Sequence, residues 1–131
     1  MIITHIDMKF ALTAAGGCGF VFRIKDSDNH LLVLLDVDGT SELGQMTPDG
    51  YDYLTYGNPK PGSTEKEGSA DFVVVAEGGR ISAFVNGERA FREAVARTNA
   101  GDMGYTILSG TNKDYGTYCW FTNTRVWELK K

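Results

Sequence analysis

The sequence predicts an all-β fold, a sandwich of two antiparallel sheets. The best evidence is residues 71–89, DFVVVAEGGRISAFVNGER, which hold two apolar runs rich in β-branched residues. Glu77-Gly78-Gly79 separates the runs, and Asn86-Gly87, a dipeptide favoured in type I′ turns, closes the second. Strand, tight turn and strand make a meander. About ten segments of this kind, with turns every 8–12 residues or so, are typical of a two-sheet sandwich.

The first half of the chain should form five strands. Apolar Ile6 and Met8 alternate with polar Asp7 and Lys9, which is the period of a half-buried strand. Residues 31–35 are apolar throughout, which predicts burial on both faces. Turns rich in glycine, aspartate and asparagine separate the runs. The expected strands span residues 2–13, 18–24, 31–35, 40–46 and 51–56.

The second half begins with an expected exposed loop at 57–69, which contains prolines, glycines and Glu65-Lys66-Glu67. The meander follows. Residues 91–97 alternate in polarity and fit either a strand or a short helix. Two further strands are expected at 103–108 and 118–129, with a loop at 109–116 between them. Phe72, Val74, Ile81, Phe84 and Phe121 are the expected core anchors.

Composition limits the functional classes. The 131 residues, 42% of them hydrophobic, suit a single domain over 1–131 with its own core. No apolar run reaches the roughly 20 residues of a membrane span, and residues 1–9 do not look like a signal peptide. The net charge is −4 and no lysine–arginine cluster is present, which argues against nucleic acid as a partner. A neutral ligand fits this charge better than a polyanion.

Two cysteines each precede a phenylalanine by two residues, Cys18 before Phe20 and Cys119 before Phe121. The shared parity predicts that both thiols face the core. We expect two buried free thiols, because a disulfide requires neighbouring strands and sequence does not establish that proximity. No CxxC pair or nearby histidine supplies a cysteine metal site.

Four stretches, in this order, resemble concanavalin A-like, laminin-G-like jelly-roll domains. They are Gly19–Arg23 followed by Asp26, Asp28 and Asn29; Asp38-Gly39 before Leu43-Gly44; the valine-rich meander ending in Val85-Asn86-Gly87; and Phe121–Val126, with Thr122 where the family has aspartate. The resemblance covers residues 6–129 and favours a strand at 91–97. It implies a fold that hosts lectins, carbohydrate-binding modules, hydrolases and adhesion domains. Family members have further strands before Ile6, so either the fold is minimal or an open edge meets another domain or chain.

Catalytic patterns are weak. The E-x-D-x-x-E string of laminarinase-type relatives is absent, as is a G-x-S-x-G motif, and the only histidines are His5 and His30. No motif transfers the activity of the related 3-keto-disaccharide hydrolase-type domains. The prediction is therefore no enzyme and no cofactor other than calcium. A calcium site from Asp26, Asp28 and Asp49 is one interpretation, since strand direction brings them to one end of a sheet; ordinary turn aspartates are the other.

Aromatic residues carry the remaining signal. Tyr51 and Tyr53 share one strand face, while Tyr118 and Trp120 have the opposite parity to Cys119 and Phe121 and should point outward. Flat rings on a sheet suit the apolar faces of sugar rings. Trp120 is the strongest candidate, and core packing is the alternative interpretation for any single ring. Tyr115, in the preceding loop, and Arg23, as a hydrogen-bond donor, complete the predicted ligand site.

These observations favour a non-catalytic carbohydrate-binding module that binds a neutral glycan by aromatic stacking. It would belong to a larger extracellular or cell-surface protein. The alternative is a protein-interaction or structural sandwich that uses an open sheet edge, and a hydrolase ranks third.

Overall fold

A computed structural model describes residues 1–11, 17–36, 40–57, 67–95, 101–108 and 118–129. The described residues form ten strands and no helix, which confirms the all-β prediction. Accordingly, no helix in these ranges could span a membrane. The strands are β1 (Ile2–Ala11), β2 (Gly17–Asp26), β3 (Asn29–Asp36), β4 (Ser41–Thr47), β5 (Gly50–Gly57), β6 (Glu67–Glu77), β7 (Arg80–Val85), β8 (Glu88–Ala94), β9 (Asp102–Leu108) and β10 (Tyr118–Glu128).

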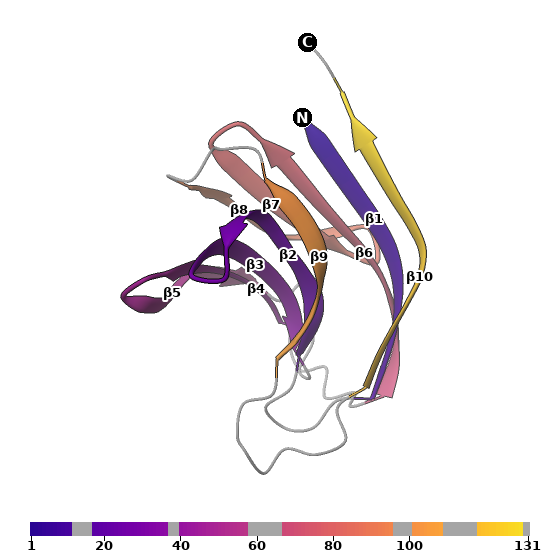
Figure 1. The fold of residues 1–131 in the computed structure, drawn as a ribbon. Coiled ribbons are helices and arrows are strands. Elements are labelled where there is room, and N and C mark those ends of the chain that lie inside the picture. Colours follow the sequence, from indigo (N-terminus) through magenta and orange to yellow (C-terminus); the bar gives the residue numbers. More distant parts are fainter. Residues whose placement is uncertain (12–16, 37–39, 58–66, 96–100, 109–117, 130–131) are drawn as a thin grey trace.

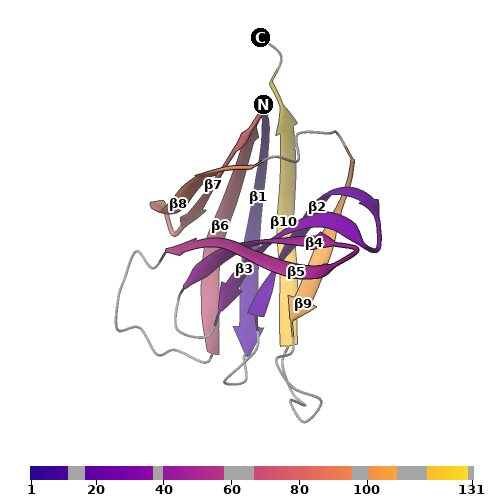
Figure 2. The same ribbon diagram turned by 90° about the vertical axis from the view of Figure 1, so that its left-hand side faces the viewer.

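Two antiparallel sheets of five strands face each other in a jelly-roll sandwich (Figures 1 and 2). The β1 sheet has the order β10-β1-β6-β7-β8, and the β3 sheet has the order β5-β4-β3-β2-β9. The β3 sheet is bent, with its concave side turned away from the β1 sheet (Figure 1). Each sheet therefore has an inner face toward the core and an outer face.

The core forms between the inner faces. Phe20 of β2 and Phe72 of β6 lie nearly parallel, with ring centroids 5.8 Å apart, so they join the two sheets. Burying a large apolar side chain contributes about 1.5–3 kcal/mol, so this layer is the main source of stability. The run 31–35 is buried on both sides of its sheet, as predicted: Leu31, Val33 and Leu35 lie in the core, and the intervening leucines are also buried.

The meander β6–β7–β8 has the predicted turn. Asn86 and Gly87 have φ values of 51° and 83°, the positive values that a type I′ turn requires at both central residues. Residues 91–94 belong to the strand β8, and Phe91 is buried, so the strand interpretation is confirmed for these four residues; residues 96–97 lie outside the described part of the chain.

The prediction of free thiols is wrong. Cys18 and Cys119 form a disulfide with their Cα atoms 6.0 Å apart. Cys18 belongs to β2 of one sheet and Cys119 to β10 of the other, so the bond crosses the core. The alternation of residues along each strand placed both thiols on inner faces. It gave no information on which residues of the two sheets lie opposite each other across the core.

One expected core anchor faces outward. Phe72, Val74 and Ile81 are buried as predicted, and Phe121 is partly buried against the core. Phe84 is only half-buried, because it has the opposite parity to Ile81 on the same strand. The outer face of the β1 sheet therefore carries this ring.

Candidate functional site

The predicted aromatic residues lie on two separate surfaces. Tyr51 and Tyr53 belong to β5 at the edge of the β3 sheet, whereas Tyr118 and Trp120 belong to β10 at the edge of the β1 sheet. Both pairs point away from the core, in opposite directions. They are therefore two candidate sites and not one.

A third tyrosine joins the first pair through a β-bulge. Leu43 pairs with Thr55 and Gly44 pairs with Tyr53, so Leu54 is an extra residue in β5. The bulge turns Tyr56 to the same side as Tyr53, and their ring centroids are 5.7 Å apart. Sequence analysis missed Tyr56 because strict alternation assigns it to the other face.

We call Tyr51, Tyr53 and Tyr56, with the neighbouring Glu42 and Asp36, the tyrosine face. It lies on the outer, concave side of the β3 sheet, because Glu42 and Gly44 have the opposite parity to the core residue Leu43. Exposed fractions rise from 42% at Tyr51 through 51% at Tyr53 to 64% at Tyr56. The outer two rings therefore offer apolar surface to a ligand.

Gly44 determines the position of Tyr51. A Cβ atom at Gly44 would collide with the Tyr51 phenol, so the missing side chain is the space that the ring occupies. The ring lies across β4 and is half-buried there. This anchors one end of the tyrosine face to the sheet.

Two carboxylates accompany the rings. Glu42 is 8% exposed, and its backbone pairs directly with Tyr56. Burial raises the pKa of Tyr51 well above its usual range, and the negative charges of Glu42 and Asp36 raise it further. The Tyr51 phenol therefore keeps its proton at neutral pH and remains a hydrogen-bond donor next to two acceptors.

The second surface is the pair Tyr118 and Trp120, which we call the Trp120 face. Both side chains point outward as predicted, with exposed fractions of 59% and 48%. Their rings stack with centroids 5.8 Å apart, and Lys9 Nζ lies 5.8 Å from the indole centroid in a cation–π contact. Tyr118 and Lys9 therefore compete with any ligand for the faces of the indole.

Arg23 belongs to neither surface. It has a φ of 52° at an irregular point of β2, and its Nη2 donates to the Gly78 carbonyl over 2.8 Å. Burial lowers the pKa of its guanidinium. Arg23 lines a pocket of about 230 Å³ between the sheets, together with Phe22, Val74 and Met103.

The predicted calcium ligands do not converge. Asp26 Oδ1 accepts hydrogen bonds from the Asp28 amide and from Asn29 Nδ2, so it stabilises its own turn. Among the described residues, three metal-ligating side chains bring their ligand atoms within 4.8 Å of one another only at His5, Asp7 and Asp71. Tyr115 lies outside the described residues.

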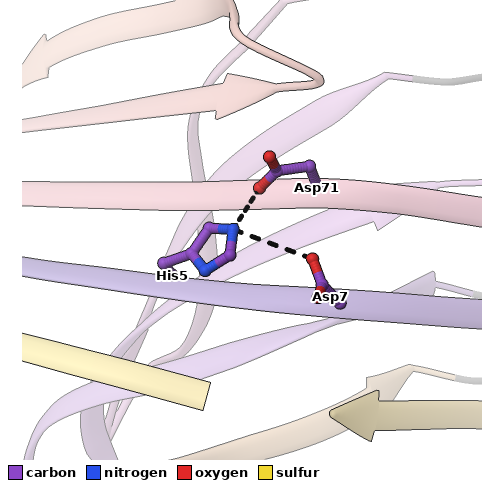
Figure 3. Close-up of side chains that lie close together, drawn as sticks. All are labelled: His5, Asp7 and Asp71. Carbon is purple, nitrogen blue, oxygen red and sulfur yellow. Dashed lines mark hydrogen bonds and ion pairs between the residues drawn. The ribbon is translucent and has the colours of Figure 1, made fainter. Parts of the chain in front are cut away.

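Sequence analysis missed the cluster of His5, Asp7 and Asp71 (Figure 3). His5 and Asp7 are two residues apart on one strand and so share its outward face, which could have been predicted from the sequence. Asp71 lies 66 residues away from His5, and only the pairing of β1 with β6 brings the two together.

No protein-family model and no curated sequence matches the chain. Many solved structures share its fold, among them the following three. A carbohydrate-binding module CBM66 from Bacillus subtilis is 14% identical with a TM-score of 0.72, and the match covers 96% of this chain and 75% of the module. The Caenorhabditis elegans galectin LEC-6 is 18% identical, with a TM-score of 0.59 and coverages of 95% and 82%. The CBM40 module of a Ruminococcus gnavus IT-sialidase is 15% identical, with a TM-score of 0.51 and coverages of 84% and 64%. The expected similarity to jelly-roll, lectin-like domains is thus confirmed for the fold.

Proposed function

We propose that this chain is a non-catalytic carbohydrate-binding module that binds a neutral glycan on the tyrosine face. The observation that carries the proposal is the arrangement of three tyrosine rings beside Glu42 and Asp36 on the concave side of the β3 sheet. The shared fold with a named carbohydrate-binding module and with a galectin supports it.

Each part of the tyrosine face has a role in this proposal. The C–H face of a sugar ring packs on Tyr53 or Tyr56, which removes apolar surface of both partners from water. Sugar hydroxyl groups donate to the carboxylates, while the Tyr51 phenol donates to a sugar oxygen. The negative charge of Glu42 and Asp36 repels acidic sugars, which makes neutral glycans the preferred class.

The Trp120 face is the competing location for the same function. Trp120 and Tyr118 are aromatic, and both are exposed, as their alternation with Cys119 and Phe121 predicts. They rank second because Lys9 and Tyr118 already contact the indole. The two surfaces make different predictions for the same set of variants.

The experiment is a glycan array on the wild-type chain, followed by calorimetry with the best neutral glycan. Tyr53→Ala and Tyr56→Ala should each weaken binding by about 1–3 kcal/mol, roughly 5- to 150-fold, as aromatic anchors do. Trp120→Ala should leave the affinity within about twofold. Loss of affinity in Trp120→Ala alone would move the site to β10. No binding to any neutral glycan would contradict the proposal.

We also propose that the module works outside the cell, as part of a larger protein. The disulfide between Cys18 and Cys119 supports this location, because such bonds form and persist in oxidising compartments. Expression with and without export to an oxidising compartment tests it: exported protein should contain the disulfide, and protein kept in a reducing cytosol should be less stable.

A protein-interaction domain is the second candidate function, and the edge strand β10 favours it. Within the described part of the chain, β10 pairs with β1 on one side only. Its far end exposes Val126 and Trp127, at 53% and 42%. Such an edge can accept a strand from another domain or chain. Light scattering should show that the chain self-associates or binds a partner, and Val126→Lys should remove this association. A chain that stays monomeric at all concentrations and binds no partner would argue against an interaction domain.

A further inference from the structure

We propose that His5, Asp7 and Asp71 form a binding site for a zinc-like divalent transition-metal ion on the outer face of the β1 sheet. His5 Nε2 lies 2.5 Å from Asp71 Oδ1 and 3.7 Å from Asp7 Oδ1 (Figure 3). One ring nitrogen thus faces a carboxylate oxygen from each of two strands. The proposal is independent of the glycan site.

The backbone fixes this convergence. His5 and Asp7 are two residues apart on β1 and share its outward face, and Asp7 lies directly opposite Asp71 on β6. The register of β1 with β6 is continuous from His5 to Asp7, whereas the pairing of β1 with β10 shifts between these two residues. Two carboxylates at directly paired positions repel each other, and a cation between them removes that cost.

Outer partners hold the two carboxylates in place. Asn123 Nδ2 donates to Asp7 Oδ2 over 2.9 Å, and this bond occupies the oxygen that does not face His5. Asn86 Oδ1 accepts from the Asp71 amide over 2.8 Å and fixes the backbone there. Such second contacts orient metal ligands and raise affinity.

The ligand set selects the class of ion. One imidazole nitrogen and two carboxylate oxygens suit zinc, which takes three protein ligands and keeps a fourth position for water. Tetrahedral zinc separates its ligand atoms by about 3.4 Å. Asp7 Oδ1, 3.7 Å from Nε2, is close to that separation, and Asp71 Oδ1, now 2.5 Å from Nε2, would move outward by about 1 Å when the ion binds. Calcium needs roughly six to eight oxygens and does not fit. Side-chain exposures of 24% for His5, 47% for Asp7 and 54% for Asp71 give an ion access.

Calorimetry of the full, metal-free chain with zinc chloride tests the site. The wild type should bind one zinc ion per chain. His5→Gln and Asp71→Asn should each weaken zinc binding at least about tenfold, a loss of the size seen when even outer partners of metal ligands are removed. His30→Gln is the matched control, because His30 is the only other histidine, and it should stay within about twofold of wild type.

Several outcomes would overturn the site. They are no saturable zinc binding by the wild type, unchanged affinity in both His5→Gln and Asp71→Asn, or loss of binding in His30→Gln. Calcium binding as tight as zinc would overturn the assignment of the ion. Circular dichroism and the intact disulfide of each variant establish that the chain is folded, and Asp71→Asn provides a second test if His5→Gln does not fold.

Discussion

Gly44 and Tyr51 form the pair of residues on which the tyrosine face depends. The ring fills the space above the glycine, and burial beside Glu42 and Asp36 favours the neutral phenol. When the folded state favours the protonated form of a group, raising the pH lowers the free energy of unfolding, because the group ionises first in the unfolded chain. This gives the environment of Tyr51 a measurable consequence in stability.

The unfolding free energy should therefore depend on pH through Tyr51. Its pKa is raised in the folded state, so its contribution is fully present below the usual tyrosine pKa of about 10 and is lost as pH rises above that value. Tyr51→Phe should lose less stability than wild type between about pH 9 and 11 in urea unfolding. Tyr118→Phe controls for removing an exposed phenol. Identical pH profiles for wild type and Tyr51→Phe would show that the ring is not held among the carboxylates.

A second residue-scale prediction tests Gly44. Gly44→Ala should displace the Tyr51 ring, and because this ring is 42% exposed and can move toward solvent, the loss of stability should stay below about 1 kcal/mol, less than in an overpacked core. It should also weaken glycan binding, because the anchor of the tyrosine face moves. Gly104→Ala on β9 is the matched control, because a Cβ atom at Gly104 would meet no heavy atom within 4 Å. Unchanged glycan affinity in Gly44→Ala would contradict the role of this contact in the tyrosine face.

The individual strands could be predicted in order, because their signals are local. Alternation reports a strand and its faces, and Asn86-Gly87 reports a turn. What could not be predicted depends on pairing between distant strands. The bulge at Leu54 that turns Tyr56 outward, and the approach of Asp71 to His5, arise from registers that no local pattern encodes.

The assignment of inner and outer faces to the meander can be tested by comparing the stability lost when Phe72 or Phe84 is replaced by alanine. Phe72 on β6 is fully buried, whereas Phe84 on β7 lies on the outer face and is half-buried. Phe72→Ala should cost about 3–5 kcal/mol, because it leaves a cavity in the core. Phe84→Ala should cost less than half as much. Equal shifts of the urea midpoint for the two variants would contradict the inner and outer faces.

At the scale of the whole molecule, the two sheets are held by packing and by one covalent link. The Phe20–Phe72 contact and the Tyr105–Phe121 contact, with centroids 5.8 and 4.4 Å apart, each join one sheet to the other. The disulfide from β2 to β10 does the same near the edge of the sandwich. Because β10 is an edge strand with a largely exposed outer side, it depends on these cross-sheet contacts more than the central strands do.

Removing the disulfide should therefore destabilise the whole sandwich. It closes a loop of 101 residues, and a link of this span restricts the unfolded chain strongly, so its loss should cost about 2–5 kcal/mol. Cys18→Ala with Cys119→Ala, compared with wild type in urea without reductant, measures this cost. Thiol labelling of denatured wild type should find no free thiol before reduction and two afterwards, since Cys18 and Cys119 are the only cysteines. If two free thiols are found without reductant, the sheets are held together by packing alone. The argument for an oxidising compartment would then also be wrong, because it rests on the disulfide.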